Sequence, residues 1–72
     1  MSQWPASKAN KVFRALLRRG WRVVSESGGS HRQLGHPDYP GTYTWAFHDG
    51  DEIGPAMLSR IAKRTGLEPR DL

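Results

Sequence analysis

A histidine stands directly behind a run of small residues near the middle of the chain, where Gly28, Gly29 and Ser30 precede His31. An exposed imidazole titrates near neutral pH and can transfer protons in a reaction. Paired glycines let the backbone approach a bulky ligand, and the amides of this run could cradle a phosphate. These parts are the minimum for a ribonuclease that uses no metal and takes the RNA's own 2′-hydroxyl as nucleophile.

A second histidine, His48, ends the clearest strand pattern, in which aromatic residues alternate with small or polar ones over residues 42–48. If the aromatic residues face a core, His48 points to the open face of the sheet. In the strand before it, a buried Leu34 would put Arg32 and His36 on the core side and His31 on the open face. A hairpin between the two strands then brings both open-face histidines to the same end. We predict His31 and His48 as the catalytic residues.

Plainer interpretations of the same residues stay open. A histidine beside a turn is most often only a solvent-exposed polar residue, and Gly-Gly-Ser is by default a turn. The three histidines could bind a metal, but their spacing matches no standard ligand set and the chain has no cysteine. The strand alternation also places His36 on the opposite side from the other two. We therefore predict no metal and no other cofactor.

The pattern of the remaining chain predicts the elements that must position these histidines. Ser7 is a candidate cap for a first helix, Gly20 a residue that ends it, Pro55 the first residue of a second helix and Gly66 its end. The expected order is a helix over 8–19, a strand over 21–26, a turn over 27–30, a strand over 31–35, a loop longer than the tightest hairpins over 36–41, a strand over 42–48, a helix over 55–65 and a last short turn. This order predicts an α+β fold, α-β-β-β-α, with a three-stranded antiparallel sheet and two helices packed on one face.

Both expected helices are amphipathic. Their apolar stripes are formed by Ala9, Val12, Phe13, Leu16 and Leu17, and by Met57, Leu58, Ile61, Ala62 and Thr65. Their opposite faces carry Lys11, Arg14 and Arg18, and Arg60, Lys63 and Arg64. We predict that these six cations, together with Gly29 and Ser30, contact the RNA backbone. Solvated helix faces are the plainer interpretation of the same charges.

Composition limits the classes of protein to consider. The 72 residues suffice for a single domain over 1–72, in which residues 1–6 are expected to form a loose arm. Eleven lysines and arginines against seven acidic residues give a net charge of +4, which favours a polyanionic partner. No apolar run approaches the ~20 residues of a membrane span, and the first residues lack the apolar centre of a secretion signal. We expect a cytoplasmic protein that does not bind a membrane.

Two stretches, "LLRRGWRVVSESGGSHRQLGHPDYPG" and its continuation "TWAFHDGDEIGPAMLSRIAKRTGL", resemble the HicA family of toxin ribonucleases. Members typically show a helix ending in a basic-Gly-aromatic corner, a strand, and Gly-Ser-His opening the next strand. A His-Pro turn, a third strand, a second histidine and an amphipathic helix ending in glycine follow. The resemblance extends from Lys8 to Leu72, nearly the whole chain.

The resemblance implies a fold like that of double-stranded-RNA-binding domains. It also implies an mRNA interferase, which cuts RNA without a metal and is held inactive by a HicB-type antitoxin; no DNA binding is expected of the toxin alone. The family's essential histidine falls on His31, with Ser30 and Gly29 as its neighbours.

The chain departs from the family pattern at three places. Many members have a proline in the third strand in place of Ala46, a lysine in place of Asp51, and Gly-Thr in place of Ala56-Met57. Two alternatives to a ribonuclease remain. One is a module of the same fold that only binds RNA or an antitoxin, and the other is a structural basic domain with incidental histidines.

Overall fold

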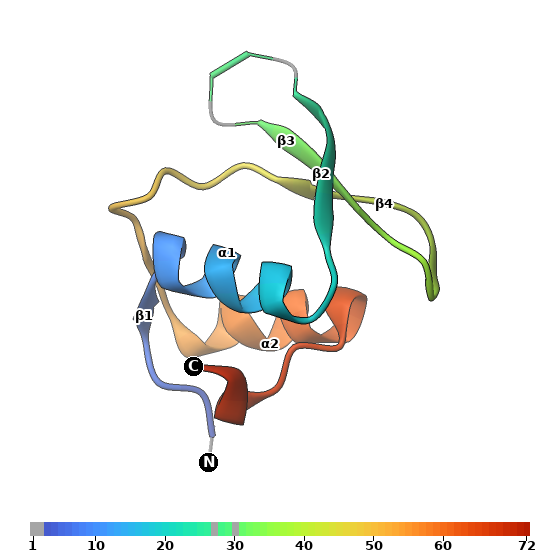
Figure 1. The fold of residues 1–72 in the computed structure, drawn as a ribbon. Helices are drawn as coiled ribbons and strands as arrows, with labels where there is room; N and C mark the ends of the chain where they lie inside the picture. Colours follow the sequence, from blue (N-terminus) through green and yellow to red (C-terminus); the bar gives the residue numbers. More distant parts are fainter. Residues whose placement is uncertain (1–2, 27, 30) are drawn as a thin grey trace.

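The computed structural model describes residues 3–26, 28–29 and 31–72. The elements are β1 (Ser7–Lys8), α1 (Ala9–Arg18), β2 (Arg22–Glu26), β3 (Arg32–His36), β4 (Tyr39–Trp45), β5 (Glu52–Ile53), α2 (Pro55–Thr65) and a one-turn 3-10 helix, η1 (Pro69–Asp71). Strands β2, β3 and β4 form an antiparallel sheet in that order, and both α-helices lie against one face of it (Figure 1). The predicted α+β arrangement is confirmed.

The core lies between the sheet and the two helices. Its buried members are Ala9, Val12, Ala15, Leu16, Trp21, Leu34, Trp45, Ile53, Leu58, Ile61 and Leu67. Two residues assigned to the apolar stripes are instead on the surface, since Leu17 is 41% exposed and Met57 38% exposed. Each lies about 100° around its helix from a buried leucine, which turns it out of the interface. Ala15, three residues after Val12, stays on the stripe and is buried in place of Leu17.

The start of α1 differs from the prediction. Ser7 was expected to cap the helix, but it pairs with Ile53 in a small two-stranded sheet of β1 and β5, and its hydroxyl donates to the carbonyl of Pro5 at 3.2 Å. The first two helical N–H groups, those of Ala9 and Asn10, donate to the carbonyls of Asp51 at 2.7 Å and Asp49 at 3.2 Å. Backbone carbonyls about 40 residues further along the chain therefore accept the N–H groups that a side-chain cap would otherwise bind.

The N-terminal segment is also more ordered than expected. Trp4 lies within the segment assigned to a loose arm, yet its side chain packs against the core. This contact, together with the β1–β5 pairing, ties the described part of the segment to the rest of the fold.

The hairpin between β3 and β4 is tighter than predicted. Strand β3 runs to His36 and β4 begins at Tyr39, so only Pro37 and Asp38 form the turn. The side chain of His36 stabilises it, because its Nδ1 accepts the N–H of Asp38 at 3.0 Å. Pro40 is tolerated in β4 because that strand is at the edge of the sheet. The third strand is consequently displaced toward the N-terminus and ends at residue 45 rather than 48.

The limits of α2 agree with the prediction. Pro55 is its first residue, and Gly66 ends it in the left-handed region at φ +78°. A β-carbon at Gly66 would collide with the hydroxyl of Tyr39, so glycine is required there for space as well as for conformation. The buried indole N–H of Trp21 donates to the carbonyl of Thr65 at 3.1 Å. The end of α2 is thereby joined to the residue that precedes β2.

Candidate functional site

His31 is exposed and lies just before β3, at the end of the sheet where β2 and β3 are connected. Its backbone N–H donates to the carbonyl of Gly28 at 3.3 Å. Gly28 and Gly29 have φ angles of +74° and +57°, which glycine adopts at little cost, and a β-carbon on either would meet no atom within 4 Å. The glycines therefore leave open space beside His31. Ser30, predicted to contact phosphate, lies outside the described residues.

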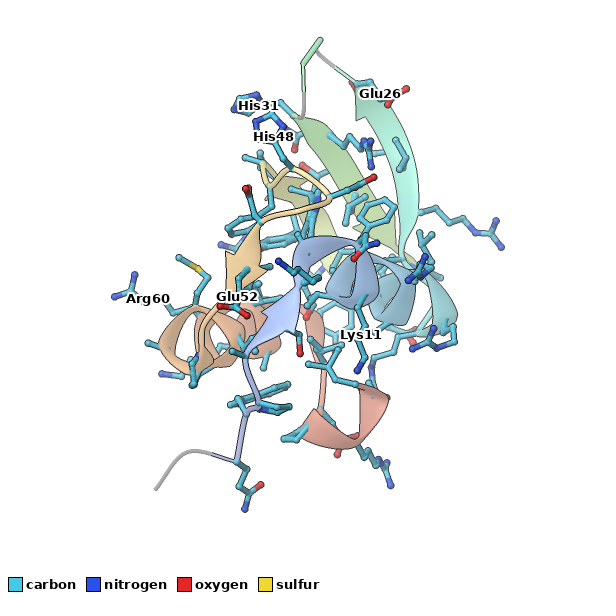
Figure 2. All side chains as sticks on the ribbon, turned by 90° about the vertical axis from the view of Figure 1, so that its left-hand side faces the viewer. Lys11, Glu26, His31, His48, Glu52 and Arg60 are labelled. Atoms are coloured by element: carbon cyan, nitrogen blue, oxygen red, sulfur yellow. The ribbon has the colours of Figure 1, made fainter. Side chains whose placement is uncertain are left out.

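His48 is also exposed and follows the end of β4. The start of β3 pairs with the end of β4, Arg32 opposite Trp45, and Figure 2 shows the two histidines at the same end of the molecule. The structure thus brings His31 and His48 to one end, as the hairpin pattern predicts. His48, however, belongs to a turn and not to the strand. The catalytic roles of both histidines stay predictions.

The turn that carries His48 is fixed from both sides. The N–H of His48 donates to Oδ2 of Asp51 at 2.9 Å, and the N–H of Asp51 donates to the carbonyl of His48 at 2.9 Å. Carbonyls of the same turn receive the first N–H groups of α1, and Nζ of Lys8 donates to the carbonyl of Gly50 at 3.4 Å. The position of His48 therefore depends on the N-terminus of α1.

A hollow of about 240 Å³ opens at this end of the sheet, and its lining residues are Gly29, Arg32, Phe47, His48 and Asp49. His48 lines it directly, whereas His31 lies between Gly29 and Arg32 in the sequence and is not itself a lining residue. The hollow is smaller than the roughly 300–1,000 Å³ of sites for drug-sized ligands. Its volume suits a small group such as a phosphate with its attached oxygens. Asp49 is an acidic residue on the rim, so the hollow is not uniformly positive.

Arg32 is the cation of this hollow, and sequence reasoning missed it. Its Nε lies 3.6 Å from Oε1 of Glu26, and the centre of its guanidinium lies 5.1 Å from the ring centroid of Phe13. An aromatic ring and a carboxylate thus hold the guanidinium, whose planar fork matches a phosphate. Strand alternation correctly placed Arg32 on the core side. Its position directly after His31 was the available signal.

The third histidine serves the fold. Nε2 of His36 lies 2.8 Å from the carbonyl oxygen of Arg19, and its Nδ1 accepts the N–H of Asp38. Both contacts are satisfied when the ring carries its proton on Nε2. The ring also packs 5.2 Å from Trp21. As predicted, His36 lies away from the other two histidines, where it joins the end of α1 to the β3–β4 turn. No three His, Cys, Asp or Glu side chains in the described ranges are grouped to hold a metal.

The six predicted RNA-binding cations do not gather at the histidines. All are exposed, and Figure 2 shows Lys11 and Arg60 on different helices and away from His31 and His48. The guanidinium of Arg18 donates to the carbonyl of Asp71 at 3.0 Å. Arg64 lies with its guanidinium 5.9 Å from the ring centroid of Tyr43. Their contacts with RNA stay predictions, and Arg32 is the cation among the lining residues of the hollow.

One departure from the family pattern now has a structural explanation. Asp51, where many members have lysine, closes the turn of His48 with its side chain. Ala46 is exposed just after β4 ends, and Ala56 and Met57 are exposed in the first turn of α2. Nothing in the structure explains these other departures.

Comparison with known families gives a match over most of the chain. Residues 9–67 match the family model of the HicA toxin of bacterial toxin–antitoxin systems. The matched region begins with α1 and ends just beyond α2, so it includes both histidines and the hollow. No curated protein matches the chain. Within the described residues, each helix is too short and too polar to cross a membrane.

Proposed function

The chain belongs to the HicA toxin family of bacterial toxin–antitoxin systems, and from that premise we propose that it acts by cleaving mRNA without a metal. His31 is the proton-transferring residue of this reaction. The observation that carries the proposal is the exposed position of His31 at the end of the sheet where Arg32 and His48 line a hollow. A base, a second proton-transferring group and a cation are the components that cleavage of a phosphodiester needs.

The proposed reaction uses the 2′-hydroxyl of the RNA. His31 takes the proton of this hydroxyl, and the 2′-oxygen forms a bond to phosphorus while the bond from phosphorus to the 5′-oxygen breaks. The leaving 5′-oxygen receives a proton from His48 or from water. Arg32 stabilises the charge that builds up on the phosphate oxygens. The products are a 2′,3′-cyclic phosphate and a 5′-hydroxyl.

Family membership implies an antitoxin partner, and we propose that it is of the HicB type. We expect it to cover His31 or the basic helix faces, because either would keep RNA from the toxin. A net charge of +4 favours a partner with acidic or mixed charge. Association should then be fast and sensitive to salt.

The test is cleavage of RNA by the purified chain and by the variant His31→Ala. Gln33→Ala is a matched control, since Gln33 lies two residues further along and bonds only to Thr42 and Thr44 among the described contacts. We expect His31→Ala to lose cleavage and growth inhibition while keeping its fold and its affinity for RNA. Gln33→Ala should cleave like the parent chain.

Two further results decide the chemistry. Cleavage should survive excess chelator, and an all-deoxy strand of the same sequence should resist. A 5′-phosphate product, or activity restored by a divalent ion, would contradict the metal-free reaction. RNA binding by the parent chain without any cleavage would favour the alternative of a module that only binds.

A further inference from the structure

A second hollow, of about 180 Å³, lies at the opposite end of the β3–β4 hairpin from His31. Its walls come from the aromatic rings of Trp21, Tyr39 and Tyr43 and from Lys63 and Arg64 of the last turn of α2. Figure 1 shows the β3–β4 turn on the same side of the molecule as the C-terminal end of α2. Three segments distant in sequence thus build this hollow.

The aromatic walls form a continuous cluster. The ring of Trp21 lies 5.1 Å from that of Tyr39 and 6.5 Å from that of Tyr43. Trp21 is fixed by its hydrogen bond to Thr65, and burial raises the pKa of the Tyr43 hydroxyl against the opposing effect of Arg64. Tyr43 therefore stays neutral at physiological pH and does not repel a phosphate. The half-buried rings of Tyr39 and Tyr43 form the uncharged surface that a ligand can contact, since Trp21 is only 3% exposed.

Two cations border these rings, and no carboxylate is among the lining residues. The carbonyls at the end of α2 favour cations there whatever the ligand, so charge alone does not assign a site. The combination is more specific, because bases of single-stranded RNA bind by stacking on aromatic and guanidinium planes while nearby cations bind the phosphates. The volume admits one flat ring system and excludes a drug-sized ligand.

We propose that this aromatic and cationic hollow binds one unpaired base of a single-stranded RNA, with Lys63 and Arg64 on the adjoining phosphates. This proposal rests on the proposed function in one respect, that the ligand is RNA. The register places the hollow beside the pair His36–Tyr39, four residues along β3 from the pair Arg32–Trp45 near His31. That separation is about 13 Å along a strand. Stacked bases are about 3.4 Å apart, so the bound base is several nucleotides from the bond that is cut.

The test uses a 2′-O-methyl RNA hexamer, which lacks the nucleophile and reports binding without cleavage. Titration should shift the NMR signals of the Trp21 indole N–H and the Tyr43 ring, and an abasic hexamer should not. Tyr43→Leu should weaken binding roughly tenfold, which is the scale of one stacked base, while Tyr43→Phe should bind like the parent chain. Lys63→Ala and Arg64→Ala should each lower the slope of log affinity against log salt by about 0.7.

Arg70→Ala is the matched control, because Arg70 is an exposed cation that does not line the hollow and is not among the six cations predicted to contact RNA. It should leave the affinity for the hexamer nearly unchanged. An equal loss with Arg70→Ala, or equal binding of the abasic hexamer, would overturn the proposal. The proposal would also be overturned if the antitoxin shifted the Trp21 and Tyr43 signals and RNA did not. The hollow would then be a protein-binding site. Loss of the Trp21 indole signal in Tyr43→Leu would mean that this variant does not fold. The salt dependence of Lys63→Ala and Arg64→Ala then tests the proposal.

The two proposals fail separately. Loss of the hexamer's effect on the hollow, with RNA cleavage intact, overturns only the base-binding site. Absence of cleavage in the parent chain, with the hexamer still shifting Trp21 and Tyr43, overturns only the ribonuclease. A dinucleotide cannot reach from His31 to the hollow. Its cleavage should therefore be unchanged by Lys63→Ala, whereas cleavage of an unmodified hexamer at low concentration should fall.

Discussion

The three histidines show how environment separates residues of one type. His31 and His48 are exposed at the same end of the sheet, whereas His36 is engaged through both ring nitrogens. A ring with both nitrogens bonded inside the fold is not available for proton transfer to a substrate. The structure therefore favours the pair His31 and His48 over any combination that includes His36.

If the two exposed histidines divide the proton transfers, the pH dependence of cleavage will show it. A base and an acid acting together give a bell-shaped pH–rate profile. His48→Ala should lower the rate chiefly on one limb of that bell, while His31→Ala removes activity at every pH. Single-turnover rates measured between about pH 5 and pH 9, a range that spans the usual titration of histidine, check this. An unchanged bell with His48→Ala would assign the second proton transfer to water.

Arg32 should matter through the geometry of its guanidinium. Arg32→Gln removes the charge beside the phosphate and should lower kcat roughly 100-fold, the scale of one lost charge-stabilising donor. Arg32→Lys keeps the charge but loses the planar fork, so we expect it to recover only part of the rate. Arg70→Gln removes an exposed cation of η1 that is not among the predicted RNA contacts, and it serves as the control. Equal losses with Arg32→Gln and Arg70→Gln would show a general effect of charge.

At the scale of elements, the 48–51 turn links the candidate site to the fold. Asp51→Ala removes the acceptor of the His48 N–H and should cost about 1 kcal/mol of unfolding free energy. Asp51→Asn keeps an oxygen in the same place and should lose less. Urea unfolding of the two variants measures the difference. Equal stability of the alanine variant and the parent chain would show that the backbone contacts alone hold the turn.

Local signals explain which elements could be predicted from the sequence. Pro55 and Gly66 limit α2 through their own backbone preferences, so their effect does not depend on the rest of the fold. The end of β4 is different, because the alternation continues through residue 48 whereas pairing ends with the partner strand. The cap of α1 was missed because it comes from Asp49 and Asp51, which sequence proximity does not reveal.

Some features of the candidate site could likewise be predicted from the local sequence, whereas others depend on the folded chain. The exposure of His31 is predicted by strand alternation and by the residues before it, both of which are local. The hollow and the role of Arg32 depend on Phe13 of α1 and on the turn after β4, which only the folded chain brings together. The base-binding hollow was missed for the same reason, since its rings and cations come from three segments.

At the scale of the whole molecule, the raised pKa of Tyr43 predicts how the stability of the fold changes at alkaline pH. Its pKa is raised in the folded chain by burial, so its contribution to stability is fully present below the ordinary value of about 10. Above that pH the unfolded chain loses its phenol proton first, and the contribution is lost as pH rises through the folded value. The melting temperature of Tyr43→Phe should depend less on pH than that of the parent chain between about pH 9.5 and pH 11, where a tyrosine hydroxyl usually titrates. Parallel pH dependences of the two melting temperatures would contradict this.

The bonds between the start of α1 and the 48–51 turn also set the order in which the molecule can be completed during translation. Lys8 and Gly50, which are in contact, are 42 positions apart, so the N-terminal helix emerges from the ribosome long before its capping partner. Domains form as their segments become available. His31 is therefore synthesised well before His48 has a fixed position, and the arrangement that the proposed reaction needs is assembled only after residue 51 has left the exit tunnel. A nascent chain shorter than that would not carry out the proposed cleavage of the message being read.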